Sequence, residues 1–146
     1  MNRRIYLDMC CFNRPYDDQL HPLIRIETEA KLLIQSEVLI GNLDLIWSFI
    51  IHYENNDNPF VDKKKQIALW ESKSTEIVSF THEIQSQAEN IMKLGIKTKD
   101  ALHIACAISA KADAFITTDR KLLNKQVNGI NITNPMDFVR RYFDEN

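Results

Sequence analysis

Short apolar segments alternate with helical segments along the whole chain, and this alternation limits the fold more than any other feature. Apolar residues at helical spacing predict amphipathic helices, whereas short β-branched runs predict strands. The expected strands are residues 5–7, 43–46, 76–79, 114–117 and 130–133. The expected helices are residues 23–37, 48–54, 61–70, 81–94 and 98–110, with a terminal helix from Pro135. The pattern predicts a three-layer α/β/α fold with a mainly parallel central sheet, and we expect residues 1–146 to form a single domain.

Composition excludes several classes of protein. The three glycines, Gly41, Gly95 and Gly129, lie far apart, whereas phosphate-binding loops, dinucleotide fingerprints and nucleophile elbows need clustered glycines. The chain has no C-x-x-C pair and no histidine pair at metal-binding spacing, which argues against structural zinc. An odd cysteine count without a secretory signal favours reduced thiols and a cytoplasmic location. The longest apolar run, residues 101–110, is too short to cross a bilayer, so we expect no membrane association.

Two aspartates lie where expected strands end. Asp8 directly follows the first strand, and Asp119 follows the fourth strand after one threonine. Because the carboxyl ends of parallel strands lie at one edge of a sheet, both carboxylates should project from that edge. A simpler alternative stays open for each residue, since Asp8 fits a turn and Asp119 fits the N-cap of a short helix over residues 120–124.

Two further acids continue the apolar faces of helices. Asp100 shares a helical row with Ile104 and Ile108, and Glu54 lies four residues after Ile50. A carboxylate on an apolar face costs free energy unless it is paired or bound to a cation. In the alternative interpretation, Asp100 only stabilises the helix dipole and Glu54 frays into solvent. Four converging carboxylates without soft ligands favour Mg²⁺ or Mn²⁺, which can activate water for phosphodiester cleavage.

The segments that hold these acids resemble the PIN domain over nearly the whole chain. They are Ile5-Tyr6-Leu7-Asp8, Ser48 followed by Glu54, Lys99-Asp100-Ala101-Leu102-His103-Ile104-Ala105, and Phe115-Ile116-Thr117-Thr118-Asp119-Arg120. The resemblance implies an endoribonuclease in which four acids bind Mg²⁺ or Mn²⁺ and catalyse RNA cleavage, namely Asp8, Glu54, Asp100 and Asp119. Many single-domain prokaryotic PIN proteins are VapC-like, which further implies the toxin of a type II toxin–antitoxin pair, an antitoxin partner and a homodimer.

Polar and basic residues beside the acids are candidates for binding the RNA substrate. They are Thr118, Asn13, Arg14, Lys99 and Arg120. The formal net charge is −2, so a nuclease of this composition needs such local positive charges to hold phosphates. By resemblance, Thr118 would help to hold metal or phosphate. The segment from Cys10 to Asp18 departs from the family pattern, so Asn13 and Arg14 either approach the substrate or only form the turn.

Two other functions remain open at the level of sequence. One is a PIN-fold module that binds RNA or a protein without cleaving, and the presence of all four acids argues against it. The other is a phosphatase or phosphotransfer domain with an aspartate at a strand end. Haloacid-dehalogenase enzymes need a second aspartate two residues after the first, where this chain has Cys10. Receiver domains need paired acids at the first strand, which residues 4–8 do not provide.

Overall fold

Five strands form an all-parallel sheet in the computed structural model, which describes residues 1–145. The strands are β1 (Arg3–Leu7), β2 (Leu43–Ser48), β3 (Glu76–Val78), β4 (Ala114–Ile116) and β5 (Ile132–Thr133). Their order across the sheet is β3-β2-β1-β4-β5, and each neighbouring pair is parallel. The predicted fold class is therefore confirmed, although β5 is shorter than the expected strand.

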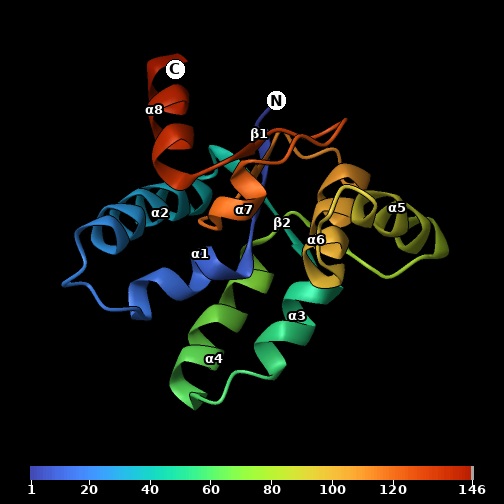
Figure 1. The fold of residues 1–146 in the computed structure, drawn as a ribbon. Helices are drawn as coiled ribbons and strands as arrows, with labels where there is room; N and C mark the ends of the chain where they lie inside the picture. The colour runs from blue at the N-terminus through green and yellow to red at the C-terminus, as the bar shows by residue number, and fades with distance from the viewer. Residues whose placement is uncertain (146) are drawn as a thin grey trace.

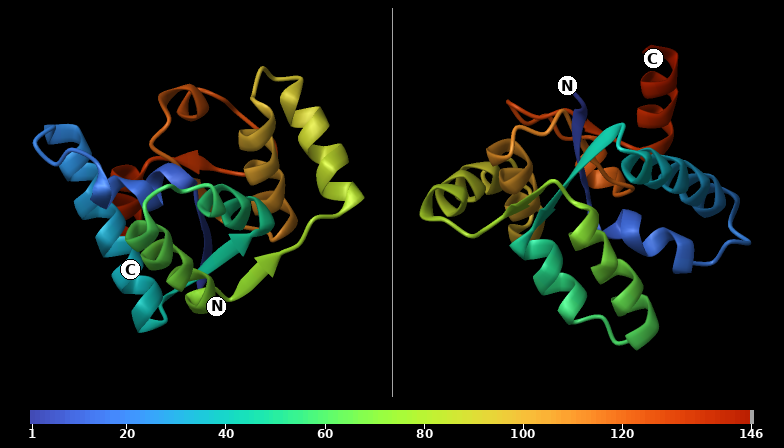
Figure 2. Two further views of the ribbon diagram at one scale, coloured as in Figure 1. Left: turned by 90° about the horizontal axis from the view of Figure 1, so that it is seen from below. Right: turned by 180° about the vertical axis from the view of Figure 1, so that it is seen from behind.

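Helices cover both faces of this sheet. They are α1 (Met9–Asn13), α2 (Pro22–Ile40), α3 (Phe49–Asn56), α4 (Val61–Ala68), α5 (His82–Met92), α6 (Thr98–Ser109), α7 (Arg120–Leu123) and α8 (Pro135–Glu145). Helices α2 and α8 pack together on one side of the sheet, and α5 and α6 pack together on the other (Figure 1). Helices α3 and α4 form a hairpin that extends from the end of β2, as the views in Figure 2 also show.

The central strand β1 determines where a site can form. Ile5 pairs with Leu45 of β2 on one side and with Ala114 of β4 on the other. The chain builds β2 and β3 outward from β1, and then crosses to β4 and β5. Ligands of open parallel sheets bind beyond the carboxyl ends of the strands at such a reversal of strand order. The segments that follow β1 and β4 meet there, because the Asp8 N–H donates to the Ile116 carbonyl oxygen at 2.9 Å.

The segment after β1 differs from the expectation of a polar loop from Asn13 to Pro22. It contains α1 and a short 3-10 helix, η1 (Arg14–Tyr16). Asp8 begins α1 as its N-cap, and its carboxylate accepts a hydrogen bond from the Met9 N–H. A five-residue helix is too short for its apolar spacing to stand out in a sequence, so only this cap indicates it.

Several helix boundaries also differ from the predicted ones. Helix α2 continues to Ile40 and ends at Gly41, whose φ of +96° is a left-handed conformation that favours glycine. The predicted cap Thr98 is instead the first residue of α6, and Lys97 precedes it without a side-chain hydrogen bond. The expected helix over residues 61–70 is divided into α4 and a 3-10 helix, η2 (Leu69–Lys73).

Aromatic side chains fill the core around β1. The ring of Tyr6 stacks on Phe115 of β4, with the ring centres 5.4 Å apart, and Trp47 of β2 packs edge-on against Phe12. All four side chains are almost completely buried. Burial of these large rings supplies much of the hydrophobic stabilisation and fixes the positions of β1, β2, β4 and α1 relative to one another.

No helix in residues 1–145 has the length and apolar character needed to span a membrane.

A lysine lies in the buried face of α2, and no carboxylate within residues 1–145 is paired with it. Lys31 is only 4% exposed, and its ammonium group lies 5.6 Å from the centre of the Phe12 ring. Glu27, one helical turn earlier, is instead paired with Arg14 at an Nε–Oε1 distance of 2.9 Å. Burial lowers the pKa of Lys31 to about 8. The folded state therefore carries a charge whose lost hydration is only partly replaced.

Replacing Lys31 by methionine should stabilise the protein at pH 7, by about 1 kcal/mol, because a buried charge is exchanged for apolar contact. The folded-state pKa lies below the unfolded value of about 10.4, so wild-type stability should rise as pH increases from about 8 to 10. The Lys31→Met variant lacks this contribution, and its advantage should shrink over that interval. Urea denaturation at pH 7 and pH 10 measures both effects. An advantage that is the same at the two pH values would contradict the role assigned to burial.

Candidate active site

Asp8 lies at the centre of the carboxyl edge of the sheet. It is 6% exposed, and its carboxylate is held by three donors. The Met9 N–H donates to Oδ1 at 2.8 Å, the Thr117 hydroxyl donates to Oδ2 at 2.8 Å, and the Cys10 thiol lies 3.5 Å from Oδ2. These contacts fix the orientation of the carboxylate, because both oxygens are used.

Thr117 joins Asp8 to Asp119. Its buried hydroxyl donates to Asp8 and accepts a hydrogen bond from the Asp119 N–H at 3.1 Å. Asp119 is exposed and also caps α7, since its Oδ1 accepts from the Lys121 N–H at 2.9 Å. The sequence left two alternatives for Asp119, a helix cap and a carboxylate at the sheet edge. In the structure, Asp119 is both. Thr118 is buried beside them, and its Oγ1 has no hydrogen-bond partner within residues 1–145.

His103 of α6 connects Asp8 to Glu54. Its ring is 1% exposed, and Nε2 lies 3.9 Å from Oδ1 of Asp8 and forms a hydrogen bond with Oε1 of Glu54. Glu54 lies near the end of α3, but its side chain turns inward to this contact. Burial by itself would lower the pKa of His103, but the hydrogen bond to Glu54 and the negative charge of Asp8 outweigh burial and raise it.

Asp100 completes the acidic edge. It lies half-buried in the first turn of α6. Burial raises the pKa of Asp100, and the negative charges of Asp8 and Asp119 raise it further. The other three acids therefore all interact electrostatically with Asp100. Three of the four acids lie at the starts of helices and one lies near the end of a helix. Within residues 1–145, no three Asp, Glu, His or Cys side chains are arranged to hold an ion by themselves. Mg²⁺ commonly takes only one or two carboxylates and completes its ligands with water and phosphate.

The other predicted site residues divide into two groups. Thr118 and Arg120 flank Asp119 in the sequence. Both line a hollow of about 350 Å³ between α2, α7 and the start of α8, and none of the four acids is among the described residues that line it. Arg14 is ion-paired with Asp17 and Glu27, and the Asn13 Oδ1 is buried without a partner in the described chain. The structure thus uses the Arg14 guanidinium to hold the segment after α1 against α2.

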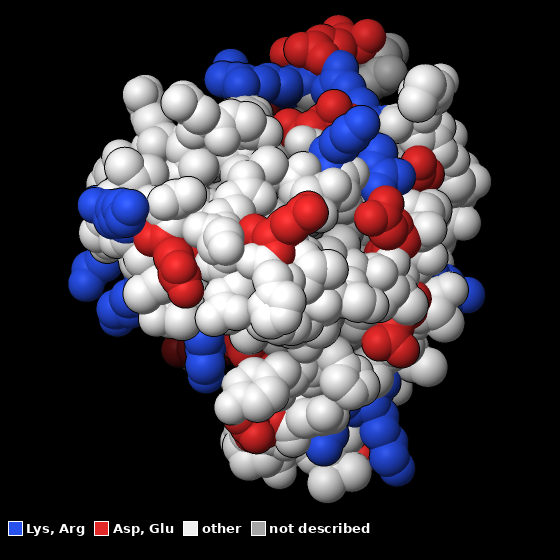
Figure 3. All heavy atoms as spheres, turned by 90° about the vertical axis from the view of Figure 1, so that its right-hand side faces the viewer, with Lys and Arg blue, Asp and Glu red and all other residues white. Residues whose placement is uncertain are grey.

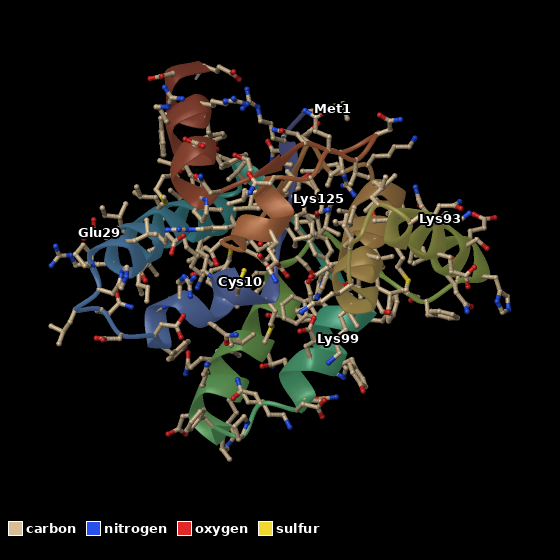
Figure 4. All side chains as sticks on the ribbon, viewed as in Figure 1. Met1, Cys10, Glu29, Lys93, Lys99 and Lys125 are labelled. Carbon is tan, nitrogen blue, oxygen red and sulfur yellow. The ribbon has the colours of Figure 1, made fainter. Side chains whose placement is uncertain are left out.

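Lys99 lies at the start of α6 beside α3, as its label in Figure 4 shows. Its ammonium group is 5.6 Å from the centre of the Tyr53 ring. Cys10, also labelled in Figure 4, belongs to α1 and lies closer to the middle of the molecule, below α7 in this view. On the face drawn in Figure 3, acidic and basic side chains are interspersed, and no extended basic surface is visible there for the described residues.

The sequence did not single out two residues that organise the edge. The sequence predicts Thr117 only as the end of a strand, and His103 as a half-buried histidine that has hydrogen-bond partners and is not a metal ligand. The sequence nevertheless contains a feature that could have indicated the role of each residue. Thr117 immediately follows the last strand position beside Asp119, and His103 is a polar residue within the apolar run of α6. Which partners they bind depends on contacts between distant segments, which local sequence patterns do not specify.

Comparisons with known proteins bear on the family and on the fold. The family model for the PIN domain matches residues 5–127. A chain in the crystal structure of VapBC2 from Rickettsia felis, bound to a DNA fragment from their promoter, has a similar fold with a TM-score of 0.57. That likeness covers 90% of this chain and 98% of the other, at 15% sequence identity, so it speaks for the fold alone. No curated protein matches the sequence significantly.

Replacing Thr117 by valine should lower the free energy of unfolding by about 1–3 kcal/mol, because valine has nearly the same shape but no hydroxyl. The Asp119 N–H would lose its acceptor, and the Asp8 carboxylate would lose a donor. Thr117→Ser restores the hydroxyl and should recover most of the loss. Urea denaturation of the three proteins makes the comparison, and equal stability of Thr117→Val and wild type would show that the hydroxyl holds neither aspartate.

Proposed function

The chain belongs to the PIN domain family, and on this premise we propose that it is a metal-dependent endoribonuclease that hydrolyses phosphodiester bonds in RNA. The observation that carries the proposal is a set of contacts among the acids Asp8, Glu54, Asp100 and Asp119 at the carboxyl edge where the strand order reverses. Thr117 links Asp8 to Asp119, His103 links Asp8 to Glu54, and Asp100 begins the helix that carries His103. Enzymes with open parallel sheets place their ligands at this position. Burial and the negative charges of Asp8 and Asp119 raise the pKa of Asp100, and a bound cation would offset this negative charge.

The residues at this edge fit Mg²⁺ or Mn²⁺. All four carboxylates offer hard oxygen ligands, and the free Oγ1 of Thr118 adds another oxygen at the same edge. Asp8, Glu54, Asp100 and Asp119 would hold the ion. When bound, such an ion supplies Lewis acidity that activates water and stabilises the leaving oxygen.

The remaining tasks fall to side chains of this chain. Arg120 and Thr118 flank Asp119 in the sequence, and we expect them to bind a phosphate or ribose of the substrate beside it. Lys99, at the start of the helix that carries Asp100, would contribute positive charge toward the RNA backbone. Asn13 and Arg14 would support the site indirectly, because the Arg14 guanidinium is already engaged by two carboxylates.

We further propose that the protein is the toxin of a type II toxin–antitoxin pair and that it forms a homodimer. The structural neighbour from the VapBC2 crystal structure supports a toxin-like assignment at the level of the fold. An antitoxin would inhibit the enzyme by placing a basic side chain among the acids, where the negative charge is concentrated.

The purified protein should cleave RNA in the presence of Mg²⁺ or Mn²⁺ and should stop when EDTA is added. Asp119→Asn should reduce the cleavage rate on the order of 100-fold or more, because an ion ligand loses its charge. The fold should remain intact, since asparagine caps a helix as well as aspartate does. Asp62→Asn, which changes an exposed acid in the first turn of α4, is the matched control and should cleave normally. Binding of RNA without cleavage by wild type would instead favour a binding module.

The cleavage products should carry 5′-phosphate and 3′-hydroxyl ends, because activated water and not the RNA 2′-hydroxyl is the attacking group. Mass spectrometry of the products from a short RNA identifies these ends. A substrate with a single 2′-deoxy nucleotide before the scissile phosphate should still be cut. Products that end in a 2′,3′-cyclic phosphate, or loss of cleavage in the deoxy substrate, would contradict attack by water.

A further inference from the structure

We propose that His103 is a positioning residue, which holds the Glu54 carboxylate toward the metal through a buried chain of hydrogen bonds that also includes Tyr6 and Ser48. The inference rests on the proposed function, since it assigns Glu54 a place among the metal ligands. None of the three residues His103, Tyr6 and Ser48 is one of the four acids or one of the substrate candidates.

The chain of hydrogen bonds is continuous and closed to solvent. The Ser48 Oγ lies 2.6 Å from the Tyr6 hydroxyl, which in turn lies 2.6 Å from Nδ1 of His103. Nε2 of His103 then bonds to Oε1 of Glu54. Ser48, Tyr6 and His103 are at most 1% exposed. Buried polar groups of this kind are costly unless each is satisfied, so the full set of partners specifies one arrangement.

The series of hydrogen bonds begins and ends at the same helix, α3. Ser48 is the N-cap of α3, where its Oγ accepts a hydrogen bond from the Ile51 N–H at 3.3 Å, and Glu54 lies in the last turn. Between them, the series of hydrogen bonds includes Tyr6 of β1 and His103 of α6. Helix α3 is therefore tied at its start and near its end to the two elements that carry Asp8 and Asp100. The position of Glu54 relative to those acids follows from these ties.

The number of available protons shows which atom donates the hydrogen bond to Glu54. A carboxylate only accepts hydrogen bonds, so Nε2 of His103 must carry a proton. With neutral imidazole, Ser48 donates to Tyr6 and Tyr6 donates to Nδ1. With imidazolium, Nδ1 donates to the Tyr6 oxygen and Tyr6 donates to Ser48. Glu54 receives the same hydrogen bond in both arrangements, so its placement does not depend on the charge of the ring.

His103 acts through Glu54 and is not itself a metal ligand. Both ring nitrogens already have partners, and the ring is closed to solvent. Its Nε2 also faces Oδ1 of Asp8 at 3.9 Å, so its N–H dipole lies between two carboxylates that would otherwise repel. Partners of metal-binding side chains orient those ligands in this way, and their loss typically weakens metal binding about 10–100-fold.

The test measures metal binding directly, without substrate. Mg²⁺ is titrated against each protein by thermal shift, and Mn²⁺ binding is measured by electron paramagnetic resonance. His103→Leu should weaken the apparent affinity for either ion by about 10–100-fold. His103→Gln places an amide N–H near the position of Nε2 and should recover most of that affinity. His103→Asn keeps a donor only on the Tyr6 side and should resemble the leucine variant.

Tyr6→Phe provides a second route that leaves His103 in place. The phenylalanine ring keeps the stack on Phe115, but the hydroxyl between Ser48 and Nδ1 is lost. The apparent metal affinity should fall by about fivefold, as expected for one hydrogen bond. In the double variant with His103→Leu, the two effects should not add, because they act through one chain. His82→Gln, which changes an exposed histidine in the first turn of α5, is the control and should bind metal as wild type does.

The outcomes separate the role of His103 from the proposed function. If wild type binds Mg²⁺ and Mn²⁺ and the leucine and asparagine variants, folded by circular dichroism, bind them equally well, His103 has no positioning role. Should His103→Leu fail to fold, equal metal affinity of Tyr6→Phe and wild type overturns the inference by itself. If wild type binds neither ion, the proposed metal-dependent function fails, and the role of His103 toward a metal fails with it.

Discussion

The parallel pairing of β1 with β4 is the constraint on which the rest of the structure depends. It places the residues after Leu7 beside the residues after Ile116, and the Asp8 N–H continues the ladder by donating to the Ile116 carbonyl oxygen. Because strands of a parallel sheet end on one edge, two aspartates distant in sequence become neighbours. Stacking of Tyr6 on Phe115 maintains the same pairing from within the core.

Helix capping and the chemistry of the site use the same atoms. Asp8 begins α1 and Asp119 begins α7, and each accepts a backbone N–H through one carboxylate oxygen. Such caps contribute about 1 kcal/mol and hold the side chain in one rotamer. A carboxylate that is already oriented loses little further entropy when it binds an ion, which is a general benefit of preorganised ligands. A residue that stabilises a local turn can therefore also serve as a prepared ligand.

The sequence was sufficient for the fold class and for the positions of the strands, because the alternation of apolar runs and amphipathic helices is a local signal. Asp8 and Asp119 were located by the same logic, and their assignment as metal ligands remains a prediction. Other features depended on distant contacts. Glu54 turns inward to a hydrogen bond with His103, which lies far along the chain. The pairing of Arg14 with Glu27 requires α2 to pack beside η1. Helix α1 was missed because it is one turn long, and Thr98 was misplaced because helix boundaries shift by a residue without a side-chain cap.

Since α3 is held at Ser48 and again at Glu54, the number of residues between them determines the direction in which the Glu54 side chain points. Each residue of an α-helix advances the side-chain direction by about 100°. One inserted or deleted residue between the two positions would leave the serine in place and turn the carboxylate away from His103 by more than a quarter of a revolution. The connection over residues 57–60, which leads to α4, is under no such requirement. Across the evolution of this chain, length changes should accumulate after the helix and not within it, so the phase of a single helix limits where the gene can gain or lose codons.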